Sequence, residues 1–390
     1  MNKNLKIAIY TGETPSTTFI ERLINGLAKK GMHIYIFGLQ RKEMDAKANT
    51  FFITYTSKIS KLFLFIKYSV LLSVYKNKAK KKLDKIILSK GNNIMHLKAK
   101  YYPVLYYKPD IFHLQWAKSI SEWIWVQEFG MELILSLRGT HITISPNADK
   151  KWKQVYQEFF PRVKTFHAVS TSMLAKTTAF GVSSKNIHVI KSGLPLKKFP
   201  FTLKTKVNTQ IKILSIGRSH FTKGYRYALD AMQILKTSNS SFQYSIIGLK
   251  QNEALLYQRA QLGLMQQVSF IAPKQFREVQ KAILEADVLL LPSIEEGIAN
   301  VVLEAMALGT LVISTNCGGM QEVILPNKTG FLVPTRNPEA IANAVQEVQT
   351  LTLKQYQEIT KQARSFVEEN HSEEKLITGM SNLYNHVIAK

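Results

Sequence analysis

The sequence predicts an α/β protein with two consecutive domains, each built on a doubly wound parallel sheet. Three observations favour this fold class. The chain has 390 residues, 45% of them hydrophobic, which is enough for two cores of ordinary size. Short apolar runs alternate with amphipathic segments of helical length, as they do in βα units. The alternation restarts after Leu196–Gln210, a polar segment containing Pro200 that predicts an interdomain linker.

In the first half, seven apolar runs have the length and composition of strands. A helix from about Ser16 to Lys30 should follow the first strand and end there, because Gly31 is a typical residue just beyond a helix end. The expected strands are Lys6–Tyr10, His33–Phe37, Phe51–Tyr55, Ile111–Gln115, Leu133–Leu137, Thr165–Val169 and Ile187–Ile190.

In the second half the alternation is clearer. The expected strands are Lys212–Ile216, Tyr244–Ile247, Val268–Ile271, Val288–Leu291, Leu311–Ser314 and Phe331–Val333. Helices are expected between them, at about Gly224–Lys236, Glu253–Leu262, Phe276–Glu285 and Val301–Ala307. Such sheets bind ligands beyond the carboxyl ends of their strands, so we expect the functional residues in the loops that follow these strands.

The charge of the chain is strongly positive and unevenly distributed. The formal net charge is +25, and residues 1–200 hold 33 Lys+Arg against 11 Asp+Glu, whereas residues 201–390 hold 19 against 16. Anionic partners are therefore expected, mainly on the first half: nucleic acid, an acidic membrane surface or phosphorylated substrates.

The most basic segment, residues 58–100, contains twelve lysines and one acid, Asp84. Its apolar runs Leu62–Ile66 and Val70–Leu72 precede a cluster of lysines, a pattern typical of a helix that lies in the surface of an anionic membrane. The alternative is a buried helix with a solvated lysine tail. The apolar stretch is too short to span a bilayer, and the first residues lack the features of a secretory leader. We therefore expect a cytoplasmic protein that is peripheral on the inner face of the plasma membrane.

Several kinds of site are disfavoured by what the sequence lacks. The single cysteine, Cys317, cannot form an internal disulfide or a cysteine-based zinc site. There is no D-x-D, H-E-x-x-H or C-x-x-C motif, so no metal site is expected. The first predicted strand is not followed by G-x-G-x-x-G, which argues against a dinucleotide oxidoreductase.

Three motifs follow predicted strands in the second half. The first is Gly217-Arg218, then four residues, then Lys223-Gly224 at the start of a helix. Glycine allows a phosphate to approach the backbone, the amino end of the helix offers N–H donors, and two cations in one loop suit a diphosphate. An ordinary basic loop is the alternative.

The second motif is Pro292-Ser293-Ile294-Glu295-Glu296-Gly297, followed by Asn300 and Glu304. Glu296 should lie in the loop after a strand, and Glu304 in the first turns of the next helix. Carboxylates accept hydrogen bonds from vicinal hydroxyls, so both residues could hold a sugar or a ribose. The alternative is that they are simply acids favoured by the helix dipole. The third motif, Cys317-Gly318-Gly319-Met320 with Glu322, ends another strand and is weak by itself.

Together, in this order and spacing, the motifs resemble the nucleotide-sugar domain of family 4 retaining glycosyltransferases. The match is strong over residues 211 to about 335, and the stretch Glu296–Val301 resembles the colanic-acid and exopolysaccharide branch of that family. The resemblance implies the GT-B fold, in which two Rossmann-like domains face each other across a cleft. Residues 1–200 would then bind the acceptor and residues 201–371 the nucleotide sugar, and a helix at 372–390 would return to the first domain.

The resemblance also assigns roles. Arg218 and Lys223 would bind the donor diphosphate, Glu304 the ribose and Glu296 the transferred sugar, so that Arg218, Lys223 and Glu296 are the catalytic candidates. Further donor contacts would come from two glycines, Gly217 and Gly297, from the backbone at Ile298, Ala299, Asn300 and Val301, and from Gly12 after the first strand. One departure concerns the position where many members carry a histidine after the strand Leu133–Leu137. This chain has Arg138 there, with His141 three residues on, and both are candidates on the acceptor side.

The resulting expectation is a metal-independent transferase with no cofactor. It would move a hexose-type sugar from a UDP- or GDP-linked donor to a glycan or lipid-linked acceptor with retention of configuration, in cell-surface polysaccharide biosynthesis. Partners would include an anionic membrane surface but no nucleic acid. The alternatives are a GT-B-like sugar-nucleotide epimerase or phosphorylase and a basic nucleic-acid-binding protein.

Overall fold

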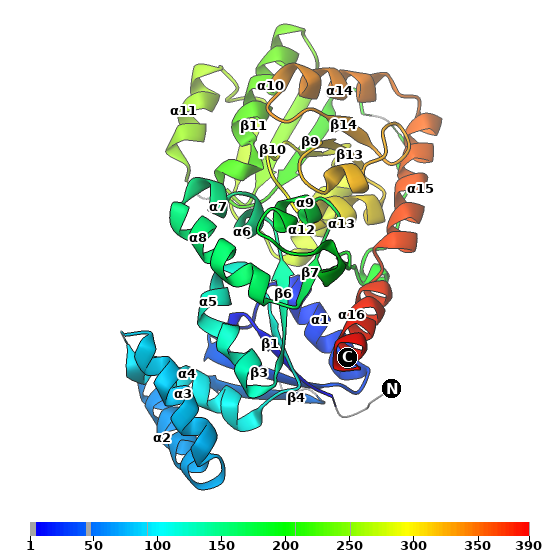
Figure 1. Cartoon of the computed structure of the whole chain (residues 1–390). Helices are drawn as coiled ribbons and strands as arrows, with labels where there is room; N and C mark the ends of the chain where they lie inside the picture. Colours follow the sequence, from blue (N-terminus) through cyan, green and yellow to red (C-terminus); the bar gives the residue numbers. More distant parts are fainter. Residues whose placement is uncertain (1–4, 44–47, 92, 207, 250, 390) are drawn as a thin grey trace. The chain divides into compact units, whose positions relative to one another are not determined.

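The computed structural model describes residues 5–43, 48–91, 93–206, 208–249 and 251–389. The chain forms two compact units, coloured along the sequence in Figure 1. The first comprises Met1–Val169, Leu174–Ile190 and Leu376–Lys390, and the second comprises Ser170–Met173 and Lys191–Lys375. The expected divisions lay at residues 200 and 371. Each unit contains one parallel sheet with helices, so the expected fold class of two parallel α/β domains is confirmed.

The sheet of the first unit has eight strands in the order β2-β3-β1-β5-β6-β7-β8, with β4 also paired to β3. All pairings are parallel; Ile7, for example, lies opposite Ile34 on one side and Ile111 on the other. The strands are β1 (Lys6–Tyr10), β2 (Gly12–Thr14), β3 (His33–Gln40), β4 (Thr50–Tyr55), β5 (Ile111–Leu114), β6 (Glu132–Leu137), β7 (Thr165–Ala168) and β8 (Ile187–Val189).

Four helices of this unit differ from simple βα connections. α2, α3 and α4 follow one another between β4 and β5, and α16 comes from the end of the chain. The helices are α1 (Thr18–Lys29), α2 (Lys58–Tyr75), α3 (Asn77–Ser89), α4 (Ile94–Tyr107), α5 (Ile120–Trp123), α6 (Thr140–Thr143), α7 (Ser145–Ala148), α8 (Lys150–Phe159), α9 (Met173–Thr178) and α16 (Glu373–Ile388). Within the described residues, no helix is both long and apolar enough to cross a membrane.

α16 packs against α1 and one face of the first sheet (Figure 1). Its apolar residues recur at helical spacing, and Ile377, Met380 and Tyr384 are buried in the same cluster as Ile20 and Leu27 of α1. The end of the chain is therefore part of the core of the first unit.

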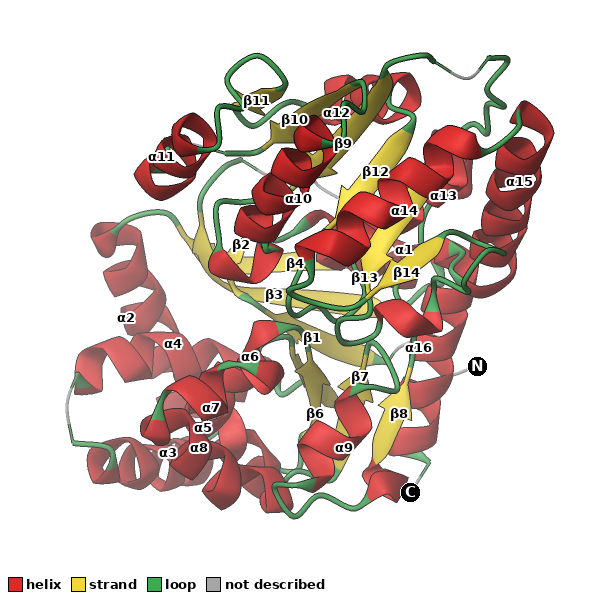
Figure 2. Ribbon diagram, turned by 90° about the horizontal axis from the view of Figure 1, so that it is seen from above, coloured by secondary structure: helices red, strands yellow, loops and turns green. Residues whose placement is uncertain are grey.

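The sheet of the second unit has the order β11-β10-β9-β12-β13-β14, with helices on both faces (Figure 2). Side chains alternate between the faces: Ile213 of β9 lies in the cluster with α10 and α14, and Leu214 lies in the cluster with α12, α13 and α15. The elements are β9 (Ile211–Ile216), α10 (Tyr225–Thr237), β10 (Phe242–Ile247), α11 (Glu253–Gln261), β11 (Val268–Ile271), α12 (Phe276–Glu285), β12 (Val288–Leu291), α13 (Asn300–Leu308), β13 (Leu311–Thr315), β14 (Phe331–Val333), α14 (Pro338–Thr350) and α15 (Leu353–Asn370).

The prediction of an interdomain linker at Leu196–Gln210 is wrong for the described part of that segment; residue 207 lies outside it. Phe199 is fully buried in the core of the second unit, and the amide of Thr202 donates to the carbonyl oxygen of Leu308 at 3.0 Å. Lys204 and Asn208 pair with the buried carboxylate of Asp287. The segment is polar in composition, which suggested a linker, but its few apolar and charged side chains are anchored on the second unit.

Candidate functional site

The loop between β9 and α10 carries the first motif. Its backbone is fixed against the loop that follows β12, because the amide of Ile294 donates to the carbonyl oxygen of Thr222 at 2.8 Å. Gly224 has φ of +65°, and a Cβ there would overlap the carbonyl oxygen of Pro292. This glycine is therefore required by the close approach of two backbone segments.

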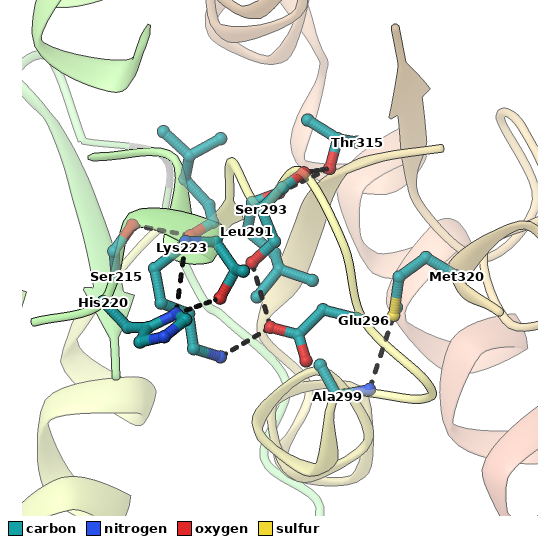
Figure 3. Close-up of polar contacts among 11 residues, drawn as sticks. Ser215, His220, Lys223, Leu291, Ser293, Glu296, Ala299, Thr315 and Met320 are labelled. Carbon is teal, nitrogen blue, oxygen red and sulfur yellow. Dashed lines mark hydrogen bonds and ion pairs between the residues drawn. The ribbon is translucent and has the colours of Figure 1, made fainter. Parts of the chain in front are cut away.

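Lys223 and Glu296 come together from these two loops. The ammonium of Lys223 lies 2.6 Å from Glu296 Oε1, and Ser293 Oγ donates to the same oxygen at 3.1 Å (Figure 3). Both side chains are about four-fifths buried, at 20% and 18% exposure, so the pair is partly shielded from solvent. Arg218, by contrast, is exposed at the end of β9.

The helix α13 begins directly after this loop. Its N-terminal residue Asn300 is preceded by Ala299, which provides no side-chain cap, and Ala299 N contacts the sulfur of Met320 at 3.5 Å. The amides of Val302 and Leu303 donate to the carbonyl oxygen of Ala299, at 3.0 and 3.4 Å. The amides of Asn300 and Val301 have no acceptor inside the helix, so an anion could use them. Glu304 is half-buried one turn further along the helix.

The glycines of the third motif pack against the second motif. The amide of Gly319 donates to the carbonyl oxygen of Gly297 at 2.9 Å, and a Cβ on Gly318 would overlap the carbonyl oxygen of Glu296. Glu322 accepts hydrogen bonds from the amides of Thr171 and Ser172, at 3.1 and 3.0 Å. The third motif thus fixes the loop that holds Glu296.

Cys317 precedes these glycines and is buried. Burial raises the pKa of its thiol to about 12, so it is protonated and unreactive at neutral pH. The three motifs therefore converge at the carboxyl ends of β9, β12 and β13, which are neighbours in the sheet, and they bring Lys223 and Glu296 into contact.

The candidates of the first unit lie at the carboxyl end of its sheet. Arg138 follows β6; its Nη2 donates to Gln115 Oε1 at 3.0 Å, and the guanidinium lies 4.7 Å from the ring centre of Phe19. Burial lowers the pKa of Arg138 to about 10, which still leaves it charged at neutral pH. Burial also lowers the pKa of His141 to about 4, so that its imidazole is neutral.

Three buried polar atoms at this edge have no hydrogen-bond partner among the described residues. They follow the adjacent strands β5 and β6: Gln115 Nε2, Arg138 Nε and His141 Nδ1. Unpaired buried donors are costly, so a cluster of them at a strand edge suits a ligand. Gly12 belongs to the edge strand β2, where it has φ of +89° and pairs with Gly38.

Comparison with known proteins places the second unit in a family. Residues 201–366 match the family described as glycosyl transferases group 1. This segment is a glycosyl transferases group 1 domain. The resemblance predicted from the three motifs is thereby confirmed, and the loops around Lys223 and Glu296 belong to that domain.

The relatives of the chain include polysaccharide enzymes. It is 30% identical over 220 residues to the amylovoran biosynthesis glycosyltransferase AmsK of Erwinia amylovora, covering 53% of this chain and 54% of the relative. It is 28% identical over 262 residues to WcaL of Escherichia coli K12, named for colanic acid biosynthesis, covering 63% of this chain and 64% of the relative. The matches thus span between about half and two thirds of these relatives.

Solved glycosyltransferase structures resemble this chain over nearly its whole length. A sucrose-phosphate synthase from Thermosynechococcus elongatus superposes with a TM-score of 0.76 at 18% identity, covering 99% of both chains. Anabaena Alr3699/HepE, solved in complex with UDP and glucose, gives 0.71 at 13% identity, covering 98% of this chain and 99% of the other. The predicted GT-B fold is confirmed.

Sequence reasoning missed one feature of the glycosyl transferases group 1 domain. A pocket of about 540 Å³ opens beside the Gly217–Gly224 loop. Its walls include the exposed ring of Phe221, which lies 4.7 Å from the ring of His220, and the amino end of α11. The sequence signal that could have indicated it is Phe221, an aromatic residue within the basic loop that follows a predicted strand. The lining residues include Ser219, Phe221, Tyr225, Arg226, Asp230 and Asn252.

Proposed function

We propose that the protein is a retaining glycosyltransferase of exopolysaccharide biosynthesis. It would transfer a hexose-type sugar from a UDP- or GDP-linked donor to a hydroxyl of a glycan or lipid-linked acceptor. The observation that carries this proposal is the convergence of Lys223, Glu296 and the uncapped amino end of α13 at one sheet edge of a glycosyl transferases group 1 domain. The relatives named for amylovoran and colanic acid biosynthesis support the pathway class.

The donor roles follow from charge. Arg218 and Lys223 would neutralise the charge that develops on the leaving diphosphate, and the first-turn amides of α13 would add N–H donors. We expect no metal ion to be needed, because these groups supply the positive charge. The carboxylate of Glu296, held by Lys223 and Ser293, is oriented to accept hydrogen bonds from sugar hydroxyls, and Glu304 would do the same for the ribose.

The bond changes require no covalent enzyme intermediate. The bond from the anomeric carbon to the diphosphate oxygen breaks, the bond to the acceptor oxygen forms on the same face, and the acceptor proton passes to the leaving phosphate oxygen. The protonated thiol of Cys317 and the ion-paired Glu296 are poor nucleophiles, which supports this route.

On the acceptor side, we propose that Arg138 and His141 contact the substrate. Arg138 is a partly buried cation whose Nε lacks an acceptor among the described residues, so it favours an acceptor with an electronegative or anionic group nearby. His141 is neutral and can donate or accept a hydrogen bond but is a weak proton acceptor, because its pKa is about 4. An acceptor linked to a lipid diphosphate at the inner membrane face would also suit the basic first unit.

The test is a thermal-shift screen of the whole chain, without metal, against uridine, guanosine, adenosine and thymidine diphosphates. A nucleotide at about 100 times its Kd adds about 2.7 kcal/mol of stability. One nucleotide should stabilise the wild type and the control Arg277→Ala, an exposed arginine on α12, but have much less effect on Arg218→Ala and Glu304→Ala. Equal shifts in all four proteins would contradict the assigned site.

Assays of turnover separate the alternatives. A transferase consumes the donor only when an acceptor is present, whereas an epimerase or phosphorylase converts its sugar substrate without one. A protein that gives no nucleotide shift but binds DNA in a salt-dependent manner would instead support the nucleic-acid alternative.

A further inference from the structure

The apolar residues of α2 are divided between two faces of the helix. On the inner face, Tyr68 and Leu72 are buried, Phe65 stacks on Tyr102 of α4, and Tyr68 Oη donates to Tyr107 Oη at 3.1 Å. The outer face is exposed although it is apolar. Its residues recur three, four or eight positions apart and so form one stripe along the helix: Ile59, Leu62, Phe63, Ile66, Val70 and Val74.

This outer stripe is the main concentration of exposed apolar side chains in the described part of the chain. Phe63 is 69% exposed and Val74 is 68% exposed. Of 17 exposed large apolar residues, seven lie on α2 and the others are scattered over ten positions elsewhere. Single exposed apolar residues are ordinary, but a contiguous stripe indicates a surface that is covered by a partner.

The charges around the stripe identify the kind of partner. α2 contains no acidic residue, and its exposed Lys58 and Lys67 have no acidic partner among the described residues. The adjoining α3 adds the exposed Lys78, Lys81 and Lys85, while its one acid, Asp84, is already occupied by Lys98 and Tyr102. A second copy of this chain would bring the same lysines together, whereas an anionic bilayer complements both the lysines and the apolar stripe.

We infer that the outer stripe of α2 enters the headgroup–acyl boundary of an anionic bilayer, with the helix parallel to the surface and the lysines of α2 and α3 on lipid phosphates. The helix is about 27 Å long at 1.5 Å per residue and lies along the membrane plane without crossing it. This inference deepens the proposed peripheral location by naming the inserted face, and it does not depend on the transferase chemistry.

The test is flotation of the whole chain with phosphatidylcholine vesicles, with and without phosphatidylglycerol, at low and high salt. Wild type should bind only the anionic vesicles and release at high salt. Phe63→Gln/Val70→Gln should weaken binding by about tenfold for each side chain removed. The control Tyr257→Gln/Met265→Gln removes two equally exposed apolar residues (66% and 56%) from the second unit and should bind as wild type does.

The outcomes are distinguishable. Equal vesicle binding by wild type and Phe63→Gln/Val70→Gln would overturn the inference. So would a wild type that binds no vesicles but is a dimer in light scattering, with the double variant monomeric. The thermal shift produced by the nucleotide should be the same in wild type and in Phe63→Gln/Val70→Gln. A failure of vesicle binding therefore does not contradict the proposed function, and a failure of nucleotide binding does not contradict the membrane surface.

Discussion

Lowering the pH from about 7.5 to about 5 should destabilise the first unit through two buried histidines. His113 and His167 are linked through Ser136: His113 Nε2 lies 2.8 Å from Ser136 Oγ, which lies 2.9 Å from His167 Nδ1. At one end of this hydrogen-bonded series, Tyr384 Oη lies 2.6 Å from His113 Nδ1. At the other end, the carbonyl oxygen of Ile190 lies 2.9 Å from His167 Nε2. All four side chains are almost fully inaccessible to solvent.

The hydrogen bonds form a continuous series when both rings are neutral. The carbonyl of Ile190 can only accept, so His167 Nε2 carries a hydrogen and its Nδ1 accepts from Ser136. Ser136 then accepts from His113 Nε2, and His113 Nδ1 accepts from Tyr384. A further proton on His113 Nδ1 or His167 Nδ1 would remove the acceptor to which Tyr384 or Ser136 donates, and it would leave a buried imidazolium without an anionic partner in this series. Burial lowers the pKa of His167 to about 3 and the pKa of His113 well below its usual value.

The sign of the pH effect follows from linkage. The unfolded chain takes up these protons below about pH 6.5 and the folded chain does not, so the stability is complete above about 6.5 and is lost as the pH falls toward about 3. At about pH 5 the loss through His167 is about 2 kcal/mol, and His113 adds a loss of the same sign. His141, with a pKa of about 4, adds a similar loss in the same unit.

The assay uses tryptophan fluorescence during urea unfolding. All four tryptophans of the chain, Trp116, Trp123, Trp125 and Trp152, lie in the first unit, so the signal reports that unit alone. His167→Gln keeps a donor and an acceptor but cannot titrate, so its loss of unfolding free energy between the two pH values should be about 2 kcal/mol smaller than in wild type. The control His33→Gln, outside the network, should keep the full loss. The same acid loss in His167→Gln and wild type would refute the reasoning.

Two further predictions concern single contacts. Tyr384→Phe leaves His113 without its buried partner and should lower the unfolding free energy of the first unit by about 1–3 kcal/mol. The same fluorescence assay at neutral pH measures this loss. An unchanged midpoint of urea unfolding would contradict the contact between Tyr384 and His113. Gly224→Ala should lower the calorimetric Tm more than Gly263→Ala does. Both positions have nearly equal φ, +65° and +64°, but a Cβ at Gly224 overlaps the Pro292 carbonyl, whereas at Gly263 it meets only a flexible lysine tip. Equal Tm losses would mean that strain at positive φ, of about 1–2 kcal/mol, is the whole effect.

Much of the fold could be predicted because its signals are local. The strand Lys6–Tyr10 and the helix Phe276–Glu285 occur at the predicted residues, since a short apolar run and helical spacing are visible in any short window of the sequence. The adjacency of the three motifs was also predictable, because parallel strands present their carboxyl ends at one edge. The predicted linker failed because the burial of Phe199 and the hydrogen bond of the Thr202 amide depend on what lies opposite them, which composition does not report.

The sequence by itself determined the two α/β domains, the motif positions and the basic first half, since each depends on residue order alone. Tertiary structure decided which of those residues touch. It made Gly224 a spacer between crossing backbones, where the sequence suggested room for a phosphate, and Gly318 a second such spacer. It also paired Lys223 with Glu296. It also decided which side of α2 is core and which is exposed. The physical reason is that contacts between distant segments depend on packing. The sequence of an apolar helix is the same whichever of its faces is covered, so the sequence alone does not identify the covered face.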